Sequence, residues 1–265
     1  MMRGKKNMIF RNTLGQEVVF DNRTLFLESI DMIGAPGIHA AESLAGADGQ
    51  QTICHQLGPK TIPCGLALKA VGDVEWLKNR LSEVFFPGHS NAGTMTVVTQ
   101  YGRYEIECYP VNVPSFTMAE NDGAYRFNVD FVADYPYWRK GAKQSITFTR
   151  GAVNSYYIQS RCPYEICPDI YLPASLSSTQ MTIKASDVVG GPTLSFLAHD
   201  FPITLTTRKF DMRNANTGEL CTNYLNPNVP LDDMRIRYGK NSVKVLSGVQ
   251  DGIVVSWYEL SMGEI

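Results

Sequence analysis

The sequence predicts a mainly β protein of two domains, and three observations support this fold class. The chain has 265 residues, which at ~100–200 residues per domain suggests two domains with cores of their own. Its composition is 44% hydrophobic and 19% charged, which is typical of a folded globular protein. Most of the chain alternates with period two, as strands with one buried face do. We therefore expect an N-terminal β-rich domain with one helix, followed by a C-terminal antiparallel β-sandwich.

One segment, at about residues 73–86, predicts a helix. Asp73 is a plausible N-cap and Glu75 lies in the expected first turn. Pro87-Gly88 ends the segment. Its apolar residues recur at helical spacing, and they are Val74, Leu77, Leu81, Val84 and Phe85.

The first half otherwise alternates between apolar and polar residues. The clearest alternation covers residues 125–131, and similar patterns cover residues 62–68 and 104–108. Gln100-Tyr101-Gly102 lies between two such runs and is short enough to close an antiparallel hairpin. These runs predict half-buried strands.

The region Gly34 to Gly58 differs from its neighbours because it is rich in Gly and Ala and shows no sustained periodicity. Loops of ~12–15 residues or more without secondary structure are uncommon inside compact domains and are often functional. An extended hairpin with its tip at Ala47-Asp48-Gly49 fits the same region.

The strand pattern ends after Phe131, and Arg139 to Lys143 form a polar stretch that contains a glycine. We therefore predict domains at residues 1–140 and 141–265. The second half contains several short strand-like runs separated by turns and no comparable helix, which indicates an antiparallel β-sandwich. The runs are Ile166–Leu172, Met181–Ile183, Thr193–Leu197, Ile203–Thr207, Lys209–Arg213, Ser242–Leu246 and Gly252–Leu260.

Charge and hydropathy exclude several classes of function. Lys+Arg number 24 against Asp+Glu 26, for a net charge of -2. This balance argues against an open basic surface for nucleic acid. No stretch approaches the ~18 apolar residues of a membrane-spanning helix, so we expect no membrane insertion. Met1 to Lys6 lead into a short segment interrupted by polar residues, so a signal peptide is unsupported.

The six cysteines are scattered through a chain that is too long and too apolar to need disulfides. We expect them to be mostly reduced and buried. They are Cys54, Cys64, Cys108, Cys162, Cys167 and Cys221.

The sequence predicts no catalytic, cofactor-binding or metal site. Gly88 to Gly93 nearly matches the Gly-x-Ser-x-Gly elbow of hydrolases, but the last glycine comes one residue late and the segment follows a helix. Ser90 is thus a poor candidate nucleophile. No glycine-rich turn leads from a strand into a helix, which excludes the Walker loop and the dinucleotide fingerprint.

The remaining polar clusters also favour structural interpretations. Cys54-His55 with Cys64, or Cys162 with Cys167, would leave a zinc site short of four ligands. His199-Asp200 and Asp232-Asp233 lie close to prolines, so loops and turns are expected there.

The tryptophans offer a sugar-stacking alternative. Trp76, Trp138 and Trp257 are candidate platforms, but Trp257 shares one strand face with Ile253 and Val255. Since aromatic residues dominate cores more often than ligand sites, we favour a core position for Trp257.

Two of the features that carry a resemblance to a known family are short motifs. Residues 131–138 end in Asp134, Pro136 and Trp138, and this end is similar to the Asp-Pro-x-Trp-like ending of an N-terminal domain, with Tyr135 as an insertion. Gly239 and Asn241 match a Gly-x-Asn turn before a late strand. Together with the expected strand at Leu25–Ile30, the helix ending at Pro87-Gly88 and the hairpin through Tyr101-Gly102, they resemble, in order, spacing and total length, the distal tail (Dit) protein family of long-tailed phages over nearly the whole chain.

The resemblance implies a structural protein and not an enzyme. Its first domain would form a ring, usually a hexamer, and its second domain would be a galectin-like sandwich. Implied partners are further copies of the chain, the tail tube protein, and a tail-tip, tail-associated or fibre protein, with DNA only as passing cargo. The implied location is the virion, at the tail tip or baseplate, after assembly in the bacterial host cytoplasm.

The physical chemistry of the chain agrees with this implication at two points. A long excursion is costly to order in a lone monomer, but packing on a neighbouring subunit can order it. Ala47, Asp48 and Gly49 are therefore the candidate subunit-contact loop. The near-zero net charge suits a protein that lets DNA pass without binding it.

Two alternatives belong to other classes of function. The first is a carbohydrate-binding module used in host-cell adhesion through the C-terminal sandwich. Tyr156, Tyr157 and Tyr164 are its candidate exposed aromatics. The second is an enzyme, for which Ser90 is the only candidate.

Overall fold

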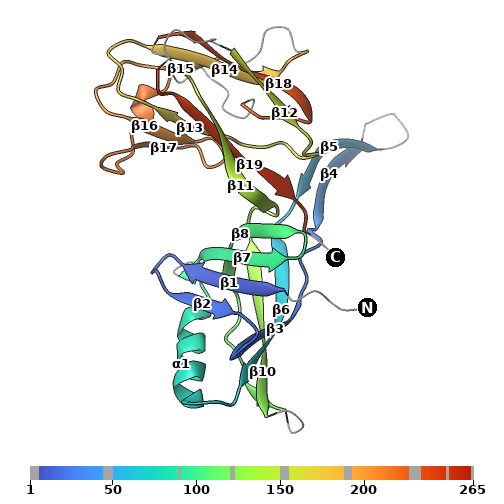
Figure 1. Cartoon of the computed structure of the whole chain (residues 1–265). Helices are drawn as coiled ribbons and strands as arrows, with labels where there is room; N and C mark the ends of the chain where they lie inside the picture. The colour runs from blue at the N-terminus through green and yellow to red at the C-terminus, as the bar shows by residue number, and fades with distance from the viewer. Residues whose placement is uncertain are drawn as a thin grey trace. The chain divides into compact units, whose positions relative to one another are not determined.

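A computed structural model (Figure 1) describes residues 6–43, 50–88, 91–119, 123–149, 155–187, 193–226, 234–248 and 251–263. Strands make up 54% of the chain, and their pairings are antiparallel. The predicted mainly β fold class is confirmed. No described helix is long and apolar enough to cross a membrane.

The chain divides into two compact units. The first contains Met1–Lys140 together with Ser261–Ile265, and the second contains Gly141–Leu260. Each unit has its own cluster of buried apolar side chains. The last residues of the chain thus return to the first unit.

The first unit is built from strands and the helix α1 (Val74–Val84). One sheet path runs through β8, β10, β6 and β3, and β1 pairs with both β2 and β7. The strands are β1 (Asn7–Asn12), β2 (Glu17–Phe20), β3 (Leu25–Ile30), β6 (Lys60–Lys69), β7 (Gly93–Thr99), β8 (Gly102–Pro110), β9 (Thr117–Met118), β10 (Ala124–Ala133) and the start of β11 (Trp138–Thr147).

The helix cap, the hairpin turn and the strand alternation of the first unit all form where the sequence predicts them. The Asp73 carboxylate caps α1 by accepting a hydrogen bond from the Trp76 backbone N–H at 3.0 Å. The predicted hairpin is confirmed, because β7 and β8 pair in register from Gly93 to Thr99. In β10, Phe127, Val129 and Phe131 are buried on one face, as the alternation requires.

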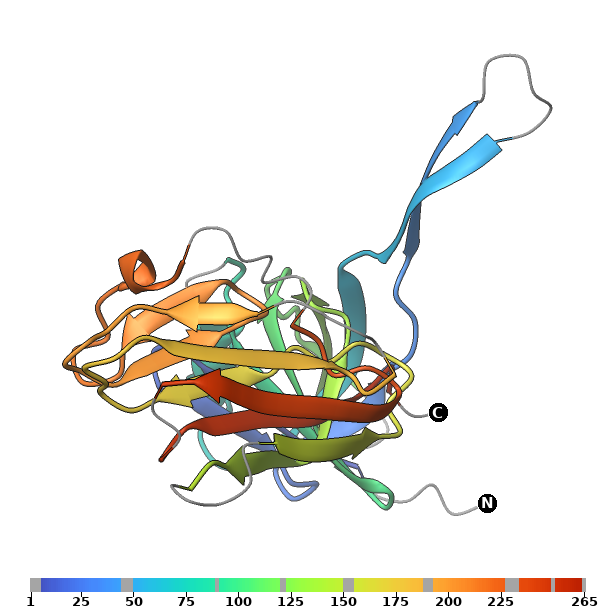
Figure 2. The same ribbon diagram turned by 90° about the horizontal axis from the view of Figure 1, so that it is seen from above.

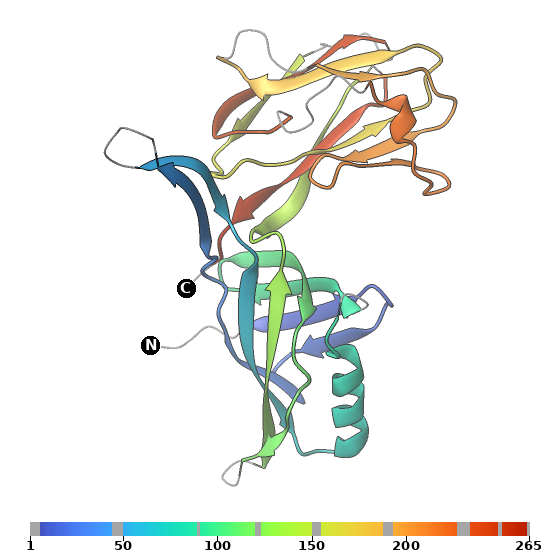
Figure 3. The same ribbon diagram turned by 180° about the vertical axis from the view of Figure 1, so that it is seen from behind.

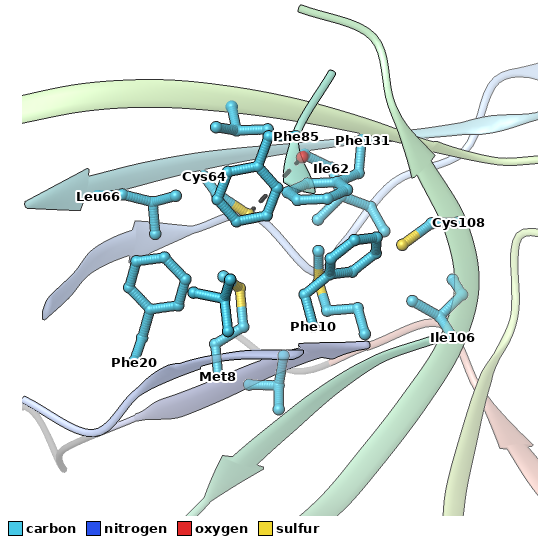
Figure 4. Close-up of a cluster of buried hydrophobic side chains, with 14 of the residues drawn as sticks. Met8, Phe10, Phe20, Ile62, Cys64, Leu66, Phe85, Ile106, Cys108 and Phe131 are labelled. Atoms are coloured by element: carbon cyan, nitrogen blue, oxygen red, sulfur yellow. Dashed lines mark hydrogen bonds between the residues drawn. The ribbon is translucent and has the colours of Figure 1, made fainter. Parts of the chain in front are cut away.

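Aromatic rings dominate the core of the first unit (Figure 4). Phe10 lies 5.1 Å from Phe131 and 5.7 Å from Phe85, measured between ring centroids. Phe85, at the end of α1, is fully buried. The helix therefore closes this core through its C-terminal turn.

The region Gly34 to Gly58 forms an arm of two paired strands, β4 (Gly37–Ser43) and β5 (Gln50–Leu57). They form a two-stranded sheet of their own. The arm leaves β3 and returns into β6, and it extends away from the sheet that those strands form (Figures 2 and 3). The extended-hairpin alternative is thus correct, because the two strands satisfy each other's backbone groups.

The second unit contains two antiparallel sheets around one core. The first joins β17, β16, β13, β19 and β11, and the second joins β12, β18, β14 and β15. Its galectin-like character stays a prediction. The strands of these two sheets, besides β11, are β12 (Ser155–Ser160), β13 (Asp169–Leu172), β14 (Thr179–Ala185), β15 (Leu194–Phe196), β16 (Ile203–Thr206), β17 (Asp211–Asn214), β18 (Gly239–Ser247) and β19 (Val254–Ser261). A short 3-10 helix covers Thr222–Tyr224.

Candidate assembly site

Trp138 ends the first motif and belongs to the core of the first unit. It begins β11 and is fully buried. Its indole Nε1 donates a hydrogen bond of 3.0 Å to the backbone carbonyl of Met32, which follows β3. Trp138 therefore joins two segments 106 residues apart.

Lys60 lies at the same carbonyl. Its side chain is fully buried, and Nζ donates to the carbonyl oxygens of Met32 and, at 2.5 Å, of Met262. Nζ also lies 5.9 Å from the centroid of the Trp138 ring. We call Met32, Lys60, Trp138 and Met262 the Met32 cluster.

The charge state of Lys60 reflects this environment. Burial lowers its pKa to about 8, and the nearby negative charge of Asp31 partly opposes the shift. The two carbonyl acceptors compensate only part of the loss of water. A buried amine therefore connects the start of β6 to the last residues of the chain.

Gly263 lies against the backbone of Met32. Its φ is +119°, and a Cβ at this position would lie 2.0 Å from the Met32 carbonyl oxygen. Both facts require glycine here, because other residues rarely adopt this conformation and any side chain would collide with backbone.

The other residues of the first motif have different roles. Pro136 is buried, whereas Asp134 is exposed and accepts a hydrogen bond of 3.4 Å from the Tyr109 hydroxyl. The inserted Tyr135 packs its ring against Tyr137, with centroids 5.0 Å apart. The motif thus turns the chain between β10 and β11.

The second motif forms a turn in the second unit. Asn241 is fully buried; its Nδ2 donates to the carbonyls of Arg237 at 2.7 Å and Gly239 at 3.0 Å. Its Oδ1 accepts from the Arg237 backbone N–H at 2.9 Å. Gly239 has a φ of +93°, which favours glycine. We call residues 237–241 the Asn241 turn.

The predicted contact loop, Ala47, Asp48 and Gly49, lies outside the described residues. The strands leading to it pair from Gly37↔Leu57 to Ser43↔Gln50. Ser90, His89 and the Asp232-Asp233 pair also lie outside the described residues.

The described cysteines have no zinc-like grouping. Cys64 and Cys108 are buried in the first core, and burial is the largest cause of their raised thiol pKa values. Cys162 Sγ donates to the Leu260 carbonyl at 3.4 Å, and Cys167 Sγ accepts from Arg235. Among the residues that the structure describes, no group of three or more His, Cys, Asp or Glu side chains could hold a metal ion.

His199 is a buried structural residue. Its Nδ1 lies 2.8 Å from the Leu197 carbonyl oxygen, and its Nε2 lies 3.1 Å from that of Pro173. Its backbone pairs with Ser175. These contacts join two loops of the second unit.

The candidate aromatics divide by exposure. Trp257 is 5% exposed and packs in the second core, as the alternation predicts. Tyr156 and Tyr164 pack against the same core, whereas Tyr157 is 59% exposed. Trp76 is 61% exposed on α1.

Sequence reasoning did not identify Lys60. A signal was present, because Lys60 begins the alternation that continues through Ile62, Cys64 and Leu66, so period two places it on the buried face. Met32 and Met262 act through backbone carbonyls, so their residue types gave no signal.

No family model matches the sequence, and no curated protein matches it. Solved structures do match. The Dit protein of phage SPP1, described as a paradigm of the hub adsorption apparatus in phages that infect Gram-positive bacteria, has a TM-score of 0.65 at 11% identity, over 97% of this chain and 99% of that chain.

Two structures of a phage p2 baseplate in its activated conformation also match. The calcium-bound structure gives a TM-score of 0.56 at 12% identity over 100% of both chains. The strontium-bound structure gives 0.53 at 10% identity, over 96% of this chain and 98% of that chain. The chain therefore has, over nearly its whole length, the Dit-like fold of phage tail hub proteins.

Proposed function

We propose that this chain is a structural, non-enzymatic protein of a phage tail, located in the virion at the tail tip or baseplate. The observation that carries the proposal is the end-to-end likeness to the SPP1 hub protein and to baseplate chains. The match leaves almost no part of this chain or of its neighbours uncovered. In this function the protein joins the tail tube protein to tail-tip or fibre proteins.

The first unit forms a ring, with a hexamer as the proposed state. Contacts of the head-to-tail kind close into a ring when the rotation between copies closes. The arm of β4 and β5 supports this assembly, because a two-stranded hairpin alone is marginally stable in water. We propose that Ala47, Asp48 and Gly49 contact a neighbouring copy, and that DNA passes through the ring during infection.

The mass of the purified protein in solution tests the ring. Size exclusion with light scattering should give about six times the 29.5 kDa chain mass. Negative-stain images of the same peak should show a central hole. A chain that stays monomeric at all concentrations, and with its tube and tip partners added, contradicts the proposal.

A variant separates the arm from the rest of the fold. Replacing residues 38–56 by a short Gly-Ser linker should abolish the ring while leaving the far-UV circular dichroism of a β protein. The matched control replaces Gln100-Tyr101, at the exposed β7–β8 turn, by Gly-Ser and should keep the ring. If the variant without the arm still forms a ring, the arm is not needed for the subunit interface.

A further inference from the structure

The arm of β4 and β5 is joined to β3 by a stretch of chain that belongs to no strand (Figure 3). β3 pairs with β6 as far as Ile30, and β4 pairs with β5 from Gly37 onward. We call residues 31–36, which lie between these paired regions, the joint of the arm. Each residue outside a strand has two soft backbone dihedrals. The direction of the arm therefore depends on the other contacts that the joint makes.

The Met32 cluster holds this joint. The Met32 carbonyl lies within the joint and accepts hydrogen bonds from Lys60 and Trp138. Lys60 begins β6, which is the strand that the arm returns into. Both ends of the arm are thus tied to one backbone carbonyl.

The two covalent links to the second unit start from the same cluster. Trp138 begins β11, through which the chain enters the second unit at Gly141. β19 ends at Ser261, where the chain comes back, and the next carbonyl, that of Met262, accepts a hydrogen bond of 2.5 Å from Lys60. All residues of the Met32 cluster belong to the first unit. Both ends of the arm and both links therefore meet there.

The segment Ser261 to Gly263, which we call the return segment, fits closely at this place. The Gly263 backbone N–H donates to Ser261 Oγ at 3.2 Å, which folds the segment on itself. Gly263 lies so close to the Met32 backbone that a Cβ would collide with it. The return segment therefore supplies Lys60 with an acceptor and packs directly on the joint.

The presence of a lysine at residue 60 indicates positioning and not filling of the core. A buried charge costs several kcal/mol, and a methionine would fill similar space without that cost. An ammonium has three donors, so Lys60 bonds carbonyls of two distant segments at once. We therefore expect Lys60 to fix where these two carbonyls lie.

We propose that the Met32 cluster is a clamp that sets the direction of the arm, with the return segment as its removable part. The arm is held while the return segment is docked on Met32 and Lys60, and it turns about its joint when the segment is released. Lys60 and Gly263 are positioning residues in this device. Because the return segment continues directly from β19, displacement of the end of that strand releases the arm. The proposal goes beyond the tail function and does not depend on ring formation.

Chemical modification of lysine amines in the full chain tests the docking. In the parent, an N-hydroxysuccinimide ester should modify the exposed Lys69 and spare the fully buried Lys60. In Gly263→Ala the new Cβ collides with Met32, so Lys60 should be modified at least about tenfold faster, measured by peptide mass spectrometry, because opening exposes its amine. Lys69 should keep its rate.

Gly15→Ala is the matched control. Gly15 lies in the same unit and also has a positive φ, +79°, but nothing lies within 4 Å of the position of its Cβ. It therefore carries the backbone strain of a substituted glycine without the collision. Lys60 should be as protected in this variant as in the parent.

Hydrogen–deuterium exchange tests the hold on the arm. In Gly263→Ala, and in Lys60→Met, which removes both lysine hydrogen bonds, the amides of the joint, β4 and β5 should exchange at least about tenfold faster than in the parent. The reason is that a two-stranded hairpin is marginally stable unless it is held. Peptides of β7 and β8, in the same unit, should keep the parent rates. Circular dichroism verifies that each variant is folded.

Three results would overturn the proposal. Arm exchange at the parent rate in both variants would show that the cluster does not hold the arm. Faster arm exchange in Lys60→Met alone, or in Gly263→Ala with Lys60 still protected, would show that the return segment is not part of the clamp. Changes in Gly15→Ala as large as those in Gly263→Ala would assign the effect to backbone strain.

This proposal and the ring fail separately. Lysine modification and exchange are both measurable on a monomer, so a chain that forms no ring still tests the clamp. Loss of a neighbouring copy alone would speed exchange of the arm without exposing Lys60. A ring in which both variants keep the parent arm exchange would remove the clamp and keep the ring.

Discussion

The Met32 cluster and the Asn241 turn both pair buried backbone groups, but with partners at very different distances along the sequence. Each uses a fully buried polar side chain to pair backbone groups. In the Met32 cluster the partners are 28 to 202 residues apart. In the Asn241 turn they are two to four residues apart. The first therefore depends on the folding of its whole unit, whereas the second depends on the local conformation of the chain.

Truncating Trp138 should have the largest effect on this comparison. Trp138→Ala should lower the free energy of unfolding of the first unit by about 3–5 kcal/mol, since it leaves a cavity in a packed core. Trp138→Phe keeps most of the ring and loses the bond to Met32, so it should cost less. Urea denaturation followed by fluorescence provides the measurement. Equal losses in both variants would assign the effect to the hydrogen bond and not to packing.

Truncating Asn241 should have an intermediate effect, confined to the second unit. Asn241→Ala should cost about 2–3 kcal/mol, because it leaves the backbone groups of residues 237 and 239 without their partner. Asn128→Ala, on an exposed face of β10, is the control and should stay within about 0.5 kcal/mol of the parent. A loss for Asn241→Ala as small as that of the control would show that the turn forms without its side chain.

Raising the pH should have the smallest effect, an increase in the unfolding free energy of the first unit. The folded-state pKa of Lys60 is about 8, below its usual 10.5. Below pH 8 both the folded and the unfolded states hold the proton, and the folded state bears the full cost of the buried charge. Between pH 8 and 10.5 the unfolded state binds more protons, so stability rises with pH. We expect a gain of about 1–2 kcal/mol, less than the full pKa difference implies, because the surroundings of a buried charge relax.

The Lys60→Met variant isolates this effect. The buried thiols of Cys64 and Cys108 have raised pKa values, so the folded state retains their protons and stability falls as the unfolded thiols ionise above about pH 9. This opposing change is common to both proteins. The difference between parent and variant in unfolding free energy should therefore rise between pH 8 and 10.5. A flat difference would show that Lys60 has its usual pKa in the folded state.

The two sites also differ in how many of their residues the sequence patterns indicate. The motif around Trp138 and the Gly-x-Asn turn were both singled out from the sequence, and the structure shows that Trp138 and Asn241 are fully buried. The alternation placed Phe127, Val129 and Phe131 on one buried face. The contacts of Lys60 were not predicted, although its place in the alternation of β6 was readable. For the region Gly34 to Gly58, the sequence alone does not distinguish a long loop from an extended hairpin.

Elements whose causes are local follow from the amino-acid sequence. Period-two alternation produces the strands, Asp73 caps the helix, and Asn241 pairs with backbone groups two to four residues away. Folding of the whole unit brings Lys60 and Trp138 to the carbonyl of Met32, and brings the last residues of the chain, with the Met262 carbonyl, to Lys60 in the first unit. The physical reason is the separation of the partners along the sequence. Contacts across 106 and 202 residues arise from packing the whole unit, and no local pattern of residue types specifies them.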